Sequence, residues 1–395
     1  MPKVIWLLVI ATAINVTGGS FLWPLNTIYM HHELGQTLAF AGFILMLNQG
    51  AAVIGNLIGG VLYDKFSAYK SILTSTFIAM TAAIILTFNH GLVPYIILLI
   101  VIGFANGMTW PIMFAMAGSV WPEGGRKAFN AVYVAQNLGV AIGATSSGFI
   151  ASISFDYIFA ANAFFIATFF LLVLFTFRKL DSYKDPQMHT TVMEQRGKFK
   201  FSPTLIALLI LCSGFLFVHI SYSQWMTTIA SYTQDIGIPL EHYSTLWAVN
   251  GFLILLFQPL VQWFTNRVTN GKHHIYIGTA ILMVSFLVVL NAEQFTMFVV
   301  AMVILSIGEV IMWPAFPTLA NELAPASRKG FYQGLVNSIA TVGRMLGPVF
   351  GGFIVDYYNI EILFFVILGL LLIPFITTTF FDRKLKKDSK VEGGL

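Results

Sequence analysis

The chain has 395 residues, of which 57% are apolar and only 10% carry a charge. Soluble domains carry about 25% charged residues, so this composition excludes a soluble protein and indicates a membrane protein with many spans. The net charge of +4 is dispersed among separate loops, which argues against nucleic-acid binding, and the single cysteine, Cys212, excludes a disulfide and a cysteine metal site.

Apolar stretches long enough to cross a bilayer follow one another along the whole chain. They predict an all-α membrane protein with twelve transmembrane helices and both termini in the cytoplasm. The apolar stretch after Lys3 is longer than the apolar region of a cleavable signal peptide, so we expect it to remain as a span. The predicted spans cover residues 4–30, 37–63, 71–89, 93–119, 128–152, 157–177, 203–232, 243–266, 274–291, 295–320, 329–355 and 360–381.

The basic residues support this count. Of the 21 Lys and Arg residues, all but Arg344 fall in loops, in tails or, for Lys329, at the end of a span, on the side that the twelve-span arrangement places in the cytoplasm. The loops placed outside carry acidic residues and no Lys or Arg. Because positive charge favours the cytoplasmic side, one missing or additional span would destroy this alternation.

The longest polar insert divides the chain into two halves of six spans each. We predict an N-terminal six-helix bundle at 1–177, a cytoplasmic linker at 178–202, a C-terminal six-helix bundle at 203–382 and a basic cytoplasmic tail at 383–395. The tail could lie against anionic lipids, although plain solvated chain explains both the linker and the tail equally well.

The two halves repeat each other. Trp110-Pro111 corresponds to Trp313-Pro314, and three glycines of the fifth span recur in the eleventh at a constant offset of 204 residues. Repeated halves are typical of transporters that open a midplane site alternately to each side. The repeat therefore predicts two pseudo-symmetric bundles. The three glycine pairs are Gly139 and Gly343, Gly143 and Gly347, and Gly148 and Gly352.

Glu309 lies near the middle of the predicted tenth span. An unpaired charge there is costly, so this carboxyl either finds a hydrogen-bonding partner or holds a proton. Trp313 follows at i+4 on the same helical face, and Pro314 removes the backbone bond to Val310 and is predicted to bend the helix. A structural role is the alternative, but proton or substrate handling is the stronger interpretation. Asn106 occupies the corresponding position of the first half, so one half alone carries the ionisable residue.

The loop between the second and third spans resembles the signature loop of the major facilitator superfamily. Gly60, Asp64, Lys65 and Lys70 match it, whereas Ser67 stands where that family usually has glycine. The resemblance implies the fold of two six-helix bundles. It also implies that these four residues form a latch on the cytoplasmic side that helps to set the conformational equilibrium.

A second motif in the eleventh span resembles the antiporter motif of drug/proton exchangers, where it belongs to the fifth helix. In the fifth span of this chain Ala144 replaces its proline, and Gly103 replaces an arginine expected in the fourth span. We expect the motif to pack helices together. It consists of Gly343, Gly347, Pro348, Gly351 and Gly352.

The chain also resembles bacterial multidrug exporters of the lactococcal type. The likeness rests on Thr27-Ile28-Tyr29, on Ala135-Gln136-Asn137-Leu138 and on Gly308-Glu309 with Pro314. In that group the glutamate of the tenth helix is implicated in drug-cation binding and protonation, and a second acidic residue of the fifth helix corresponds here to Val132.

Further polar and aromatic residues of the spans are candidates for the cavity. Arg344 must face water, a carboxyl group or an anionic substrate, because lipid would reject it. His219 is either a packing histidine or a proton carrier, and interhelical packing is an alternative for every amide. The predicted proton or substrate site comprises Glu309, Arg344, Asn15, Asn26, Asn106, Trp110, Gln136, Asn137, His219, Tyr222, Trp225, Asn250, Trp313 and Asn337.

We therefore predict a secondary active transporter that works by alternating access and exports amphipathic or cationic drugs in exchange for protons. The alternatives are a transporter of a sugar or organic acid anchored by Arg344, or a lipid or glycolipid flippase. No Walker-type loop is present, so we expect no ATP hydrolysis. We expect a transporter and not an enzyme, with no cofactor and with the proton gradient as the energy source. We expect no metal site, a monomer among membrane lipids, and a bacterial plasma membrane as the location.

Overall fold

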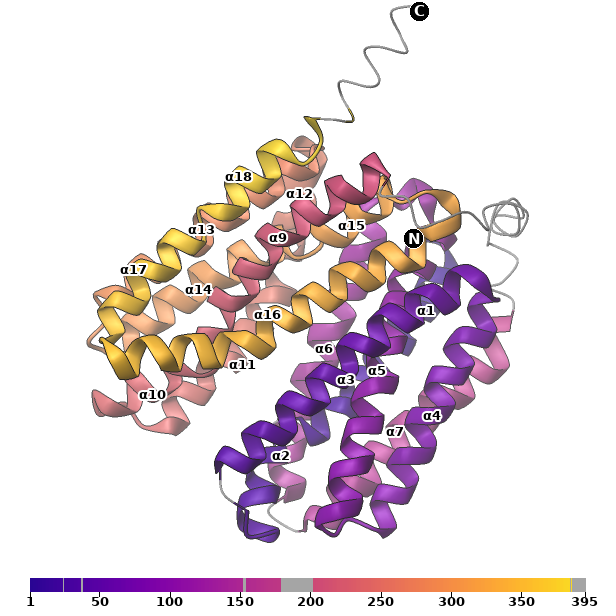
Figure 1. Cartoon of the computed structure of the whole chain (residues 1–395), viewed down its shortest axis with the longest axis horizontal. Coiled ribbons are helices and arrows are strands. Elements are labelled where there is room, and N and C mark those ends of the chain that lie inside the picture. The colour runs from indigo at the N-terminus through magenta and orange to yellow at the C-terminus, as the bar shows by residue number, and fades with distance from the viewer. Residues whose placement is uncertain (24, 37, 152–153, 179–201, 384, 386–395) are drawn as a thin grey trace, which may run out of the picture. The chain divides into compact units, whose positions relative to one another are not determined.

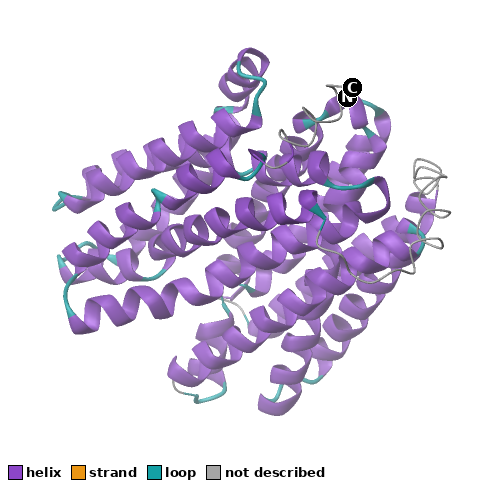
Figure 2. Ribbon diagram, turned by 45° about the horizontal axis from the view of Figure 1, so that its top comes forward, coloured by secondary structure: helices purple, strands orange, loops and turns teal. Residues whose placement is uncertain are grey.

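The computed structural model describes residues 1–23, 25–36, 38–151, 154–178, 202–383 and 385. Within these residues the regular structure is entirely helical, and short loops join the helices (Figure 2). Most of the predicted linker and of the basic tail lies outside the described residues. The predicted domain boundaries remain a prediction.

The helices follow the predicted spans closely (Figure 1). Those of the first half are α1 (Lys3–Leu22), α2 (Asn26–Ile28), a π-helical turn (Tyr29–Glu33), α3 (Leu38–Lys65), α4 (Ala68–Phe88), α5 (Leu92–Val120), a 3-10 turn (Pro122–Gly124), α6 (Arg126–Ala151) and α7 (Phe155–Thr176).

In the second half several predicted spans consist of two consecutive helices. The helices of the second half are α9 (Pro203–Ser223), a 3-10 turn (Gln224–Met226), α10 (Thr228–Asp235), α11 (Leu240–Leu256), α12 (Gln258–Arg267), α13 (Gly271–Leu290), α14 (Phe295–Met312), α15 (Ala315–Leu323), a 3-10 turn (Ala326–Arg328), α16 (Lys329–Tyr357), α17 (Ile360–Leu370) and α18 (Ile373–Phe380).

Every predicted span corresponds to helix in the described residues, which confirms an all-α membrane protein. By length and apolar composition, 10 of these helical segments qualify as membrane spans, or 11 if the pair α11 and α12, bent by 51°, is one span. The remaining predicted span is α6, which has 26 residues but a more polar composition. Which side of the membrane the termini occupy remains a prediction.

The two Trp-Pro repeats differ in backbone structure. Helix α5 continues through Pro111, whereas α14 ends at Met312 and α15 begins at Ala315, on either side of Pro314. Pro314 has no N–H to donate to Val310, so the break occurs where the sequence predicts a bend. The break lies within one turn of Glu309.

The described chain forms two compact units: Met1–Gly197 with Pro325–Ser338, and Lys198–Ala324 with Ile339–Leu395. In the first unit, a Cβ added at Gly143 of α6 would lie 2.4 Å from the carbonyl oxygen of Thr17 on α1. In the second, a Cβ at Gly343 of α16 would lie 2.6 Å from the Cβ of His219 on α9. The absence of side chains at these repeated glycines therefore allows the backbones to approach closely in both units.

Candidate functional site

A buried carboxyl network occupies the second unit, around Glu309 of α14. The Glu309 side chain is 4% exposed. Its Oε1 accepts a hydrogen bond from Trp313 Nε1 at 2.9 Å, and its Oε2 accepts one from Asn250 Nδ2 of α11 at 3.0 Å. The Tyr222 hydroxyl group of α9 lies close enough to this carboxyl to interact with it electrostatically. Three helical segments thus meet at one titratable group.

Local sequence explains how α14 holds this geometry. Trp313 lies four residues after Glu309, so its indole reaches back to the carboxyl along the same helical face. Gly308 faces α13, where an added Cβ would lie 2.8 Å from the carbonyl oxygen of Gly278. Glu309 is the next residue along α14, so its side chain leaves the helix on an adjacent face, where it meets Asn250. The Asn250 amide also donates to Ser306 Oγ at 2.9 Å, which fixes its orientation.

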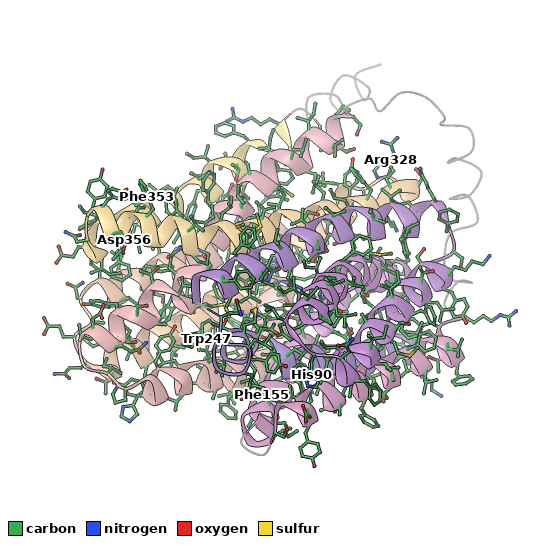
Figure 3. All side chains as sticks on the ribbon, turned by 60° about the horizontal axis from the view of Figure 1, so that its bottom comes forward. His90, Phe155, Trp247, Arg328, Phe353 and Asp356 are labelled. Carbon is green, nitrogen blue, oxygen red and sulfur yellow. The ribbon has the colours of Figure 1, made fainter. Side chains whose placement is uncertain are left out.

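Aromatic rings surround the Trp313 indole. The His219 ring stacks on it, with centroids 4.7 Å apart and planes inclined by 10°. The Phe215 and Tyr222 rings meet it edge-on at 5.8 and 5.2 Å. Trp247 of α11, labelled in Figure 3, lies edge-on to Tyr222 at 6.2 Å. Trp313 and Trp247 are half-buried, so they present accessible aromatic surface beside the carboxyl network.

The two other ionisable candidates of this unit have few partners. His219 is 5% exposed, and neither of its ring nitrogens has a hydrogen-bond partner among the described residues. Arg344 of α16 is exposed, and one of its terminal nitrogens donates to Thr341 Oγ1 at 3.1 Å. Arg344 interacts electrostatically with both His219 and Tyr222. The structure thus brings Glu309, Asn250, Trp313, Tyr222, His219 and Arg344 together.

Trp225 occupies a different environment. It is fully buried, and its ring lies 6.4 Å from that of Phe286. This places Trp225 in the core of the unit, away from the rings around Trp313.

The remaining candidates belong to the first unit. Asn26 accepts a hydrogen bond from Tyr95 at 2.6 Å, and Asn137 and Asn337 donate to the backbone of their own helices. Asn15 is buried on α1. The others, all half-buried, are Asn106, Trp110 and Gln136.

The predicted latch residue Asp64 caps a helix. It is 6% exposed at the end of α3, and its two oxygens accept hydrogen bonds from the backbone N–H groups of Gly330 and Phe331, both at 2.7 Å. These amides belong to the first turn of α16, where N–H groups lack helical partners and negative charge is favourable. Gly60 allows the approach, since a Cβ there would lie 2.3 Å from Gly330 O.

The basic residues of the same loop, Lys65 and Lys70, are exposed. The structure therefore gives Asp64 and Gly60 a defined contact with α16, and the role of all four residues as a latch remains a prediction.

Two of the aromatic residues around Trp313 were not predicted from the sequence. Phe215 lies four residues before His219 on the same face of α9, and Trp247 lies three residues before Asn250 on α11. Helical spacing from the polar candidates could have identified both. Among the described residues, no three His, Cys, Asp or Glu side chains gather as metal ligands would.

Comparisons with known proteins place these features in context. The family model described as Major Facilitator Superfamily matches residues 8–267 and 211–394. An uncharacterized MFS-type transporter, YttB of Bacillus subtilis (strain 168), is 52% identical over 390 residues, covering 98% of this chain and 97% of that protein. The multidrug resistance protein MdtH of Shigella dysenteriae is 22% identical over 354 residues, covering 89% of this chain and 86% of that protein.

Among solved structures, the human organic anion transporter MFSD10 (TETRAN) superposes with a TM-score of 0.75 at 13% identity, covering 96% of this chain and all of that one. At this identity the likeness concerns the fold alone.

Proposed function

Because the chain belongs to the major facilitator superfamily, we propose that it exports amphipathic compounds from the cell in exchange for protons. The chain is a transporter of the bacterial plasma membrane and not an enzyme. The distant relatives named multidrug resistance proteins support the proposed class of substrate. Proton exchange is supported by the chemistry around Glu309.

The observation that carries the proposal is the set of neutral donors on this carboxyl. A carboxylate only accepts hydrogen bonds, and Asn250 and Trp313 supply them, while the Tyr222 hydroxyl lies beside the carboxyl. A protonated carboxyl must also donate one. The Tyr222 hydroxyl can both donate and accept, so it can bond Glu309 in either state. The network therefore accommodates a proton without leaving a buried charge or an unbonded oxygen.

Protonation of this network also provides a route to movement. Its members come from α9, α11 and α14, and Trp313 sits at the break between α14 and α15. When Glu309 gains or loses a proton, the hydrogen bonds that join these helices change in direction and strength. The break at Pro314 is where α15 can change its direction relative to α14 at low cost.

The accessible rings beside the network suit an amphipathic substrate. Trp313 and Trp247 offer large flat apolar surfaces, while the polar groups around them fix orientation. A substrate with a cationic group would compete with the proton for Glu309, and this competition would link export to proton entry.

The test is transport by purified protein reconstituted in vesicles with an imposed proton gradient. We expect Glu309→Gln to abolish gradient-driven movement of ethidium, Hoechst 33342 and carboxyfluorescein, whichever of these the wild type carries. Glu322→Gln, an exposed carboxyl on the neighbouring helix α15, is the matched control and should transport normally. Normal gradient-driven transport by a folded Glu309→Gln protein would refute the proposal.

A further inference from the structure

Two polar side chains beside the Glu309 network lack the partners that their chemistry requires. The His219 side chain is 5% exposed, yet within the part of the chain that the structure describes neither ring nitrogen forms a hydrogen bond. Native structures rarely leave a buried polar group unbonded, and each such case calls for a specific explanation. His274, by contrast, bonds the backbone oxygen of Val268 at 2.6 Å. His219 is therefore available to a ligand.

Arg344 is the second group. Its hydrogen bond within the described part of the chain goes to the neutral Thr341, and it forms no ion pair there. An arginine at membrane depth is stable when it faces water or pairs with an anion, and Arg344 is exposed rather than enclosed by protein. The guanidinium presents a planar fork of N–H donors that matches a carboxylate.

The two groups lie at the same level of touching helices. Gly343 of α16 packs against the Cβ of His219, and Arg344 is the next residue along α16. Arg344 interacts electrostatically with His219 and with Tyr222. Glu309 is bonded from the other direction by Trp313 and Asn250. One region of the second unit thus contains the Glu309 carboxyl and, across the rings around Trp313, the Arg344 cation beside the unbonded imidazole of His219.

We propose that His219 and Arg344 form a subsite for the carboxylate of a zwitterionic amphipathic substrate. The substrate carboxylate accepts from the Arg344 guanidinium and from the N–H of the neutral His219 ring. The aromatic or apolar body of the substrate lies against the accessible surfaces of Trp313 and Trp247. Its amine lies towards Glu309, where it competes with the proton.

Charge complementarity selects this class over a simple cation. A compound with a cationic group alone would leave Arg344 without a counter-ion and would be repelled by it. A compound with a carboxylate alone would satisfy Arg344 but would add a net negative charge near Glu309. A zwitterion pairs both groups and keeps the region neutral. This inference rests on the proposed exchange of substrate for protons. It changes the expected substrate class from the cationic drugs that the resemblance implies to zwitterions.

The experiment compares three ligands that share one aromatic body. They are 2-naphthylalanine, which is a zwitterion, its N-acetyl derivative, which is an anion, and its methyl ester, which is a cation. Binding to the purified full chain in detergent is measured by calorimetry in buffers of different ionisation enthalpy, which also reports proton release. We expect the zwitterion to bind wild type most tightly and to release a proton.

Variants assign the subsite. Arg344→Gln should weaken binding of the zwitterion by roughly 10- to 100-fold, because it removes a charge-assisted hydrogen bond. Binding of the ester should not weaken and should become tighter, because the variant also removes the charge that repels it. Arg344→Lys should keep most of the affinity, which separates loss of charge from misfolding. His219→Phe keeps a ring stacked on Trp313 but removes the ring N–H, so it should weaken binding of the zwitterion several-fold.

The outcomes separate this proposal from the proposed function. Equal binding of the zwitterion and the ester to wild type, unchanged zwitterion affinity in Arg344→Gln, or no measurable zwitterion binding would overturn the carboxylate subsite. If instead Arg344→Gln loses the zwitterion while Glu309→Gln still transports and releases protons, the subsite stands and the proton role of Glu309 fails.

Discussion

Replacement of Gly343 by alanine tests the close contact between α9 and α16 that positions the site. The new methyl group would lie 2.6 Å from the Cβ of His219 and 2.9 Å from the carbonyl oxygen of Leu216. Carbon atoms pack at about 3.5–4.0 Å, so the helices must separate by about 1 Å. Neither neighbour is the end of a flexible side chain, so the strain cannot be relieved by a simple rotamer change.

The expected magnitude follows from two opposing effects. Overpacking a tight interface costs about 1–3 kcal/mol. Alanine is favoured over glycine within a helix by about 1 kcal/mol, which offsets part of that cost. Gly352 of the same helix and the same motif is the matched control, because an added Cβ there would meet nothing within 4 Å. Both variants gain the helical preference, so their difference of about 1–3 kcal/mol isolates the crowding.

Thermal unfolding in one detergent, followed by intrinsic fluorescence, measures this difference. We expect Gly343→Ala to unfold several degrees below wild type and Gly352→Ala to unfold at or above wild type. Because His219 lies at the crowded contact, Gly343→Ala should also weaken ligand binding. Equal midpoints for the two variants, or a lower midpoint for Gly352→Ala, would refute the close approach of the two helices.

Two further substitutions test the remaining contacts. Asp64→Asn keeps the shape of the cap but loses its charge, so the first-turn amides of α16 should exchange with deuterium roughly 5- to 30-fold faster, corresponding to about 1–2 kcal/mol. Unchanged exchange at Gly330 and Phe331 would contradict the cap. Asn250→Leu removes a donor from Glu309 at similar volume and should lower the free energy of unfolding by about 1–3 kcal/mol. A denaturation series that shows equal stability would argue against this hydrogen bond.

The sequence predicts the helices well because the length and apolar composition of each stretch are local properties that do not depend on distant segments. The spacing of four between Glu309 and Trp313 predicts a shared face, and the structure confirms it with a direct hydrogen bond. Pro314 predicts a bend because a missing N–H is a local property, and the regular helix is interrupted there between Met312 and Ala315, while the bend itself stays a prediction. Pro111 shows the limit of the same argument, since α5 continues through it.

The partners of the site could not be predicted, because they depend on the packing of distant segments. Asn250 reaches Glu309 across 59 residues of sequence, and a packing role was an equal alternative for this amide. Trp225 and Tyr222 are three residues apart on the chain, yet Trp225 is fully buried in the core while Tyr222 lies against the Trp313 ring beside the carboxyl. For His219 the sequence leaves two roles open, and neither the packing role nor the proton role predicts two unbonded nitrogens.

The repeated Trp-Pro pairs have a consequence for how such a chain diverges after internal duplication. Two identical halves would carry either two buried carboxyls or none, and two would double the free-energy cost of charge at membrane depth. In this chain Asn106 precedes the unbroken Trp110-Pro111 and Glu309 precedes the broken Trp313-Pro314. Charge and backbone break therefore occur in the same copy. Specialisation of one duplicate leaves the other free to keep a continuous helix and a neutral amide.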